Sequence, residues 1–182
     1  VNVLNLETRQ LAAPVTIEAG VETLQAVGDR ALALGETDDY QRFVGLITLG
    51  KQPQLSSWQV EDIFENEYAS HVFSLSPKRR IFARSIDVAP DDTAGHQQTY
   101  SQTLYTQIDD DFSLRPLGNL LGNPAFMAQF PCEDDVCNAW FQTARSIFWN
   151  DRVFLVSQYE LIEAVLVNDA LEEVSRLTFG RY

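Results

Sequence analysis

The side chains best placed to do chemistry in this sequence are carboxylates that come in two short runs. One run is Asp109–Asp111 and the other is Glu133–Asp135. Calcium takes about six to eight oxygen ligands, so an oxygen-rich turn suits it. Neither run has the alternating ligand spacing of the known calcium loop. We expect Asp109, Asp110 and Asp111 to form either a solvated turn or a calcium site, with no other cofactor.

Two cysteines, Cys132 and Cys137, enclose the second acidic run. A zinc site needs four ligands, and the spacing of this pair is not that of a redox motif. The pair therefore predicts a local disulfide, Cys132–Cys137, which would stabilise the loop by about 2 kcal/mol in the chain-entropy model. Because disulfides persist in oxidising compartments, the protein is expected to be secreted, at the cell surface or periplasmic.

Aromatic residues beside this loop are candidates for binding. Trp140 and Phe141 follow Cys137 closely, and exposed aromatic side chains at a pinned loop can anchor a ligand. Trp149 ends an apolar run, so it is expected to pack between sheets. The two histidines, His71 and His96, have no spaced metal-ligand partner, and no G-x-S-x-G motif is present. The sequence thus leaves enzymatic activity undecided and favours binding.

Composition limits the partners. The 182 residues carry 26 acidic and 13 basic side chains, a net charge of −13. Nucleic acid is disfavoured because no basic stripe exists to release counterions from phosphates. An anionic membrane surface would repel the chain, and no apolar run is long enough for a transmembrane segment. A cell-surface protein or a glycan remains as an expected partner.

A strand pair joined by a tight polar turn with an arginine recurs along the chain. The arginines are Arg30, Arg80 and Arg152, and we interpret them as structural, each holding a carboxylate or a turn carbonyl. Each such hairpin is followed by a second one, whose turns lie at 50–53, 109–111 and 168–169. Alternating apolar residues and Asp, Asn, Gly or Pro turns are typical of hairpins.

Three units of four antiparallel strands follow, at about 21–60, 68–118 and 142–180. Four-stranded units in series are typical of β-propeller blades. Residues 1–18 look like half a blade, and 118–141 read as an insertion that contains the disulfide. The prediction is an all-β protein with about three and a half blades, which the remaining blades of a longer protein would complete. A β-sandwich is the alternative.

The third unit carries a resemblance to a known group of proteins. The segments Cys132–Cys137, Ala144–Phe154 and Tyr159–Glu163 resemble a bacterial and archaeal family of uncharacterised secreted proteins with a C-terminal β-propeller domain. Val1–Leu6 is similar to a blade strand of that family, and Glu67–Phe73 to a segment that precedes a blade. The resemblance implies an exported propeller without assigned chemistry, and it supplies no catalytic residues.

The sequence therefore favours an extracytoplasmic β-propeller that binds or scaffolds. Two alternatives stay open. One is a hydrolase that uses acidic residues at the mouth of the propeller channel, since such carboxylate pairs are set by distance in space rather than by spacing in sequence. The other is a structural subunit of a surface assembly.

Overall fold

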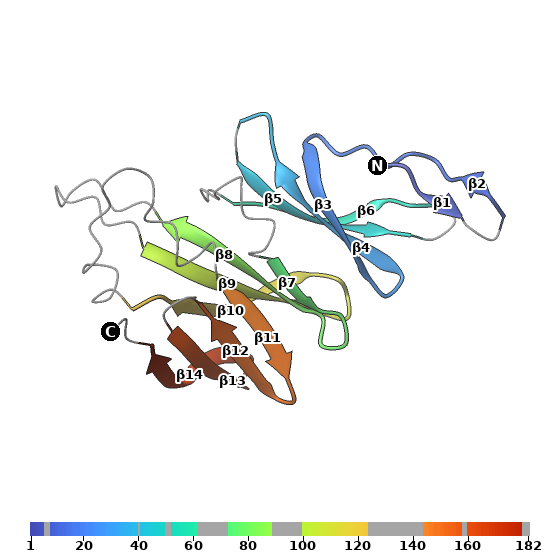
Figure 1. Ribbon diagram of the computed structural model, residues 1–182. Helices are drawn as coiled ribbons and strands as arrows, with labels where there is room; N and C mark the ends of the chain where they lie inside the picture. The colour runs from blue at the N-terminus through green and yellow to red at the C-terminus, as the bar shows by residue number, and fades with distance from the viewer. Residues whose placement is uncertain are drawn as a thin grey trace. The chain divides into compact units, whose positions relative to one another are not determined.

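The computed structural model describes residues 1–5, 8–39, 41–49, 52–61, 73–88, 100–123, 144–157 and 160–179. Within these ranges the regular structure consists of β-strands, without a helix (Figure 1). Three antiparallel sheets of four strands form the framework, and a two-stranded sheet precedes them. In the described part of the chain, no helix is long and apolar enough to cross a membrane.

The chain divides into two compact units. The first comprises Val1–Ile63 with Ile108–Leu114, and the second comprises Phe64–Gln107 with Arg115–Tyr182. The first unit contains the small sheet of β1 (Leu4–Asn5) and β2 (Gln10–Leu11). It also contains a four-stranded sheet of β3 (Gly20–Val27), β4 (Arg30–Glu36), β5 (Arg42–Thr48) and β6 (Leu55–Glu61).

The core of the first unit lies between the N-terminal segment and one face of the β3–β6 sheet. Val15 packs there with Ala33, Phe43 and Ile47, all buried. The backbone of Gly20 and the ring of Phe43 approach Gly35 closely, because Gly35 has no side chain. An added Cβ there would collide with the Gly20 carbonyl and with the Phe43 ring. This face of the sheet is therefore covered by the part of the chain that precedes it.

The second unit contains two four-stranded sheets. One consists of β7 (Phe73–Ser76), β8 (Ile81–Val88), β9 (Tyr100–Ile108) and β10 (Leu114–Leu121), although Ile108 and Leu114 count with the first unit. The other consists of β11 (Arg145–Trp149), β12 (Arg152–Val156), β13 (Glu160–Val167) and β14 (Ala170–Thr178). In both sheets the strands are neighbours in the order in which they follow along the chain.

These two sheets share one hydrophobic core. We call the side of the β11–β14 sheet that packs in this core its inner face. It contributes four residues that are each at most 1% exposed: Val153, Leu155, Ile162 and Ala164. The β7–β10 sheet contributes five buried residues: Ile81, Ala83, Tyr105, Leu117 and Leu120. Side chains that alternate with those of the inner face point to the opposite side of the sheet, which we call the outer face.

Corresponding edges of the two sheets meet. At the first strands, the backbone N–H of Ser146 in β11 donates to the Ser74 hydroxyl in β7. The Ser146 hydroxyl also forms a 2.8 Å hydrogen bond with the phenol of Tyr105 in β9. At the last strands, Arg176 of β14 donates to the Leu121 carbonyl of β10 at 2.8 Å. The sheets are thus stacked with first strand near first strand and last near last.

The two ends of the stacked sheets differ. At one end the β7–β8 and β11–β12 turns are joined by an ion pair of Arg79 and Asp151 at 3.0 Å. Because antiparallel strands alternate in direction, the connections 89–99 and 122–144 both leave from the opposite end. We call these the short-turn end and the long-connection end.

The prediction of three four-stranded antiparallel units is confirmed. Two details differ. The strands expected in 1–18 are two residues each, and Pro14, which lacks a donor, interrupts the pairing. Beyond it, Val1 and Val15 exchange two backbone hydrogen bonds while their side chains pack on the next sheet. Strand β10 continues to Leu121, so 118–121, expected in the insertion, is strand. Gly118 at φ 122° allows Leu117 and Leu120 both to face the core.

Candidate functional site

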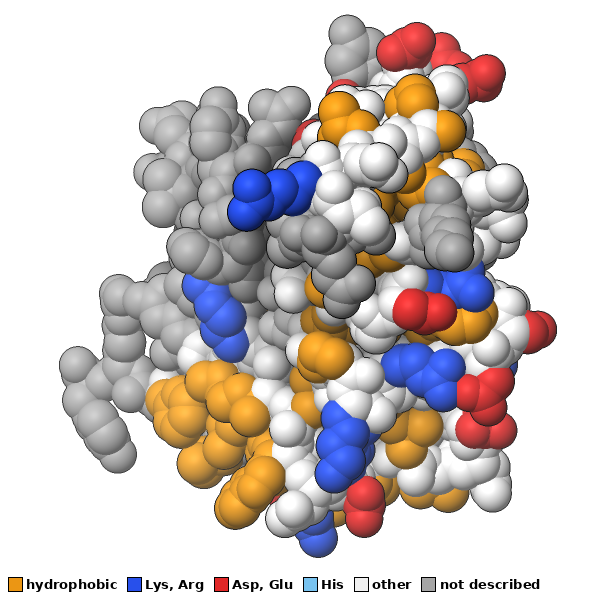
Figure 2. Space-filling view, turned by 90° about the vertical axis from the view of Figure 1, so that its right-hand side faces the viewer, with side chains coloured by type: hydrophobic (Ala, Val, Ile, Leu, Met, Phe, Trp, Pro, Cys, Tyr) orange, Lys and Arg blue, Asp and Glu red, His pale blue; other side chains and the backbone are white. Residues whose placement is uncertain are grey.

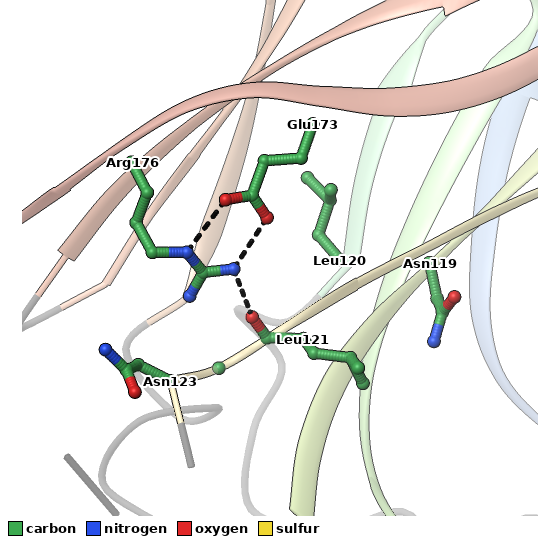
Figure 3. Close-up of a pocket in the computed structure, with 7 residues that line it drawn as sticks. Asn119, Leu120, Leu121, Asn123, Glu173 and Arg176 are labelled. Atoms are coloured by element: carbon green, nitrogen blue, oxygen red, sulfur yellow. Dashed lines mark hydrogen bonds and ion pairs between the residues drawn. The ribbon is translucent and has the colours of Figure 1, made fainter. Parts of the chain in front are cut away.

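A pocket lies at the long-connection end, between the last strands of the two stacked sheets (Figure 3). Its volume is about 420 Å³. The lining residues come from the end of β10 and from β14: Asn119, Leu120, Leu121, Gly122, Asn123, Glu173 and Arg176. The pocket is therefore formed by two strands that are distant in sequence and that the stacking brings together.

Arg176 organises this pocket. Its Nε and one terminal nitrogen donate to the two carboxylate oxygens of Glu173, at 2.9 and 2.7 Å (Figure 3). The other terminal nitrogen donates to Glu160 at 2.7 Å. The hydrogen bonds that Arg176 donates to Glu173, followed by the charge of Glu160, raise the pKa of the Arg176 guanidinium, which stays protonated.

Glu160 is the buried member of the group, with 2% of its side chain exposed. One carboxylate oxygen accepts from Arg176, and the other accepts from the backbone N–H of Asn123 at 3.1 Å. A buried carboxylate requires such partners, because desolvation of an unpaired charge costs several kcal/mol, about 3–5 when a partner is removed. Glu160 thus ties the start of the 122–144 connection to the β11–β14 sheet.

This arrangement fits a structural tie better than a catalytic pair. Both carboxylates already accept hydrogen bonds from one guanidinium, which also donates to the Leu121 carbonyl. Two acidic side chains and one basic one leave the site with one negative charge, so a ligand there would be cationic or rich in hydroxyl donors. The pocket can hold the connection in place while its open side remains available to solvent.

The acidic run Asp109–Asp111 lies in the turn between β9 and β10. The Asp111 carboxylate accepts from the backbone N–H and the hydroxyl of Ser113, at 2.9 and 2.7 Å. These hydrogen bonds lower the pKa of Asp111. The hairpin turn expected here is confirmed, and one of its carboxylates serves to shape it.

The structure brings together no metal-binding group around this turn. Among the described residues, no three histidine, cysteine, aspartate or glutamate side chains are arranged to hold a metal ion. Calcium binding by Asp109, Asp110 and Asp111 stays a prediction.

The other predicted site residues lie outside the described residues. These are Cys132, Cys137, Trp140, Phe141, His71 and His96. Strand order shows only where the described strands next to these segments lie: within the second unit, β7 begins and β8 and β10 end at the long-connection end. The predicted disulfide and aromatic pair follow β10 in the sequence, and β10 ends beside the Arg176 pocket.

The hairpin arginines have different contacts. Arg152 forms an ion pair with Glu163 on the neighbouring strand, as expected. Arg30 instead places its guanidinium carbon 3.2 Å from the centre of the Phe112 ring, within the first unit. Arg80 lies in the turn with φ 54°, one residue before β8.

Sequence reasoning missed the pair of Glu160 and Arg176. The two residues come together because β13 and β14 form a hairpin, in which Ile162 lies opposite Arg176. A register shift at Glu163/Ala164 precedes this pairing. The sequence signal that could have indicated the pair is a glutamate and an arginine on the two strands of one hairpin. The register shift, which the sequence does not reveal, is what places them close together.

Comparisons with family models, with curated proteins and with solved structures found no match for this chain.

Proposed function

We propose that the protein is part of a β-propeller outside the cytoplasm that binds or scaffolds other molecules, with the three four-stranded sheets as three of its blades. The observation that carries this proposal is the strand order that the three sheets share. Each consists of consecutive strands, as in a propeller blade. In a β-sandwich of the immunoglobulin type, Greek-key connections pass from one sheet to the other.

The same face of the repeated hairpin packs on the preceding chain in both units. The β3–β4 and β11–β12 hairpins each have a two-residue turn that leads from the partner of an arginine to that arginine. Three residues after the arginine, Ala33 faces the N-terminal segment and Leu155 faces the β7–β10 sheet. In a ring of blades, each blade packs the same face on the blade before it. These two hairpins both pack that face on the part of the chain that precedes them.

The binding surface is assigned to the long-connection end. Loops carry recognition more often than the scaffold that positions them. Here the long connections 89–99 and 122–144 leave from one end, and the second contains Trp140, Phe141 and the predicted disulfide. The remaining blades of the same protein would extend this surface around the ring.

A glycan and peptide array tests the proposal, with the double variant Trp140→Ala/Phe141→Ala as the critical sample. Loss of two aromatic anchors is expected to weaken binding at least about tenfold, or about 1.4 kcal/mol. Lys78→Ala, in the turn at the short-turn end, is the matched control and should bind as the wild type does. Binding lost in the control and kept in the double variant would contradict the assignment.

The predicted location has its own test. Intact mass after alkylation, with and without reduction, reports whether Cys132 and Cys137 form a disulfide. Resistance to alkylation until reduction is expected. Free thiols in protein isolated under oxidising conditions would remove the argument for an extracytoplasmic location.

A further inference from the structure

The outer face of the β11–β14 sheet is apolar and exposed. Ile147 is 51% exposed, Trp149 66% and Leu177 57%. Figure 2 shows hydrophobic side chains gathered low on the molecule, at the height of these strands in Figure 1. A shallow groove of about 650 Å³ on this face includes Trp149 and Phe154, whose ring centres are 6.5 Å apart.

The sequences of β12 and of the end of β13 are typical of strands covered on both faces. A sheet with one face in water alternates apolar and polar residues, whereas doubly covered strands are continuously apolar. β12 reads Val-Phe-Leu-Val after its arginine, and β13 ends Ala-Val-Leu-Val. In the β7–β10 sheet, β8 is buried at six consecutive positions, Ile81–Ile86, so both faces of that strand are covered, although Arg84 and Ser85 are among the six.

The corresponding face of the neighbouring sheet is covered in the structure. Counted from the hairpin turn, Ile81 and Ala83 are the first and third residues of β8, and both pack against the β11–β14 sheet. The first and third residues of β12 are Arg152 and Phe154, which lie on the outer face. The uncovered surface is therefore the one that, one sheet earlier, receives the next sheet.

We propose that this outer face is the docking surface for a further four-stranded sheet of the same polypeptide, an inference that rests on the ring described under Proposed function. The occupant presents the face equivalent to Val153 and Leu155, with aliphatic side chains that pack on Phe154 and Trp149. The ion pair of Arg152 and Glu163 is already formed on this face, so the incoming sheet need not supply a charge for either residue.

Two observations select the same polypeptide over a second copy. The net charge of −13 repels a like-charged copy at long range. The sheet packing seen in the second unit joins consecutive segments of one chain, for which the effective concentration is on the order of millimolar.

Cysteine accessibility in the complete polypeptide that the gene encodes tests this inference. Ile147→Cys reports on the outer face, and Lys78→Cys is the control in an exposed turn. Wild-type protein measures any labelling of Cys132 and Cys137. In the complete polypeptide, maleimide should modify Cys at 147 at least about tenfold more slowly than Cys at 78, because labelling then requires local opening. In the 182-residue chain alone, the two rates should be similar.

Equal rates in the complete polypeptide would overturn the inference. So would protection that appears in the 182-residue chain and increases with its concentration, since that would identify a second copy as the occupant. If Ile147→Cys fails to fold, Trp149→Cys replaces it, because a side chain that is 66% exposed contributes little packing in this chain. The array experiment above is independent of these rates, so either proposal can fail alone.

Discussion

The two faces of the β11–β14 sheet are built from the same strands and from similar residues, yet their environments are opposite. On the inner face, Val153 and Ile162 are fully buried against the β7–β10 sheet. On the outer face, Ile147 and Trp149 are more than half exposed. Apolar character therefore shows that a face is suited to burial, while the neighbouring sheet determines whether it is buried.

The two faces also differ in the interactions that stabilise them. The inner face is held in its middle by hydrophobic contacts and near its edges by the hydrogen bonds of Tyr105 and Arg176. The outer face has the Arg152 and Glu163 ion pair, with Arg152 about half exposed. Exposed ion pairs contribute about 0–1 kcal/mol, so we expect substitutions to have much larger effects on the inner face.

The largest effect is expected for Leu155→Ala. Leu155 is 1% exposed within the shared core, so truncation leaves a cavity and should reduce the free energy of unfolding by about 3–4 kcal/mol. Ile147→Ala, on the outer face, is the matched control and should cost about 0.5 kcal/mol. Urea unfolding of the 182-residue chain measures both. Equal losses would show that the outer face is also packed in this chain.

Arg176→Met should come next, with a loss of about 3 kcal/mol. The substitution leaves the Glu160 carboxylate, 2% exposed, without its counter-charge. The double variant Glu160→Gln/Arg176→Met removes both charges and should recover much of the loss. Thermal and urea unfolding of the two variants give the comparison. A double variant as unstable as the single one would refute a charge-based explanation.

Tyr105→Phe should have a moderate effect that depends on pH. Loss of the hydrogen bond with Ser146 should cost about 1 kcal/mol at neutral pH. Burial raises the pKa of the Tyr105 phenol above its usual value of 10.0, so the folded state keeps the proton that the unfolded state releases. Wild-type stability should therefore decrease above about pH 10, by up to about 1.4 kcal/mol per pH unit.

The phenylalanine variant provides the measurement for this pH dependence. It lacks the titrating group, so its stability should decrease less between about pH 9 and pH 11 than that of the wild type. Urea midpoints across this range give the two slopes. Parallel slopes would show that Tyr105 does not titrate differently in the folded and unfolded states.

The smallest effect is expected for Trp149→Ser. Its side chain is 66% exposed in this chain, so the change should alter the free energy of unfolding by no more than about 0.5 kcal/mol. In the complete polypeptide the same substitution should cost about 3 kcal/mol or more if a further sheet covers the tryptophan. Equal small effects in both proteins would contradict the docking inference.

Turn chemistry made the sheets predictable. Asn and Asp adopt the left-handed conformation that a two-residue hairpin needs, and Asn150, Asn168 and Asp169 all have positive φ. With the turns located, period-two alternation assigned the strands between them. The N-terminal strands were predicted longer than β1 and β2. Val1 and Val15 still exchange two backbone hydrogen bonds, and their side chains also pack on the neighbouring sheet.

The pocket was not predictable, because it depends on contacts between elements. Arg176 meets the Leu121 carbonyl only because two sheets stack with their last strands adjacent. Glu160 reaches Arg176 only through a shifted register in β13 and β14. Hairpin patterns in the sequence contain neither the order of stacking nor the position of a bulge.

The separation of short turns from long connections has a consequence for variation. The Arg79 and Asp151 ion pair and the two-residue turns fix one end of the stack, so a change of length there would disturb strand register. Segments 89–99 and 122–144 begin and end outside the hydrogen-bonded ladders. Changes of length within 89–99 or 124–143 should therefore leave strand register intact, provided that Asn123, which holds Glu160, and Ala144, which is buried in the core, are kept.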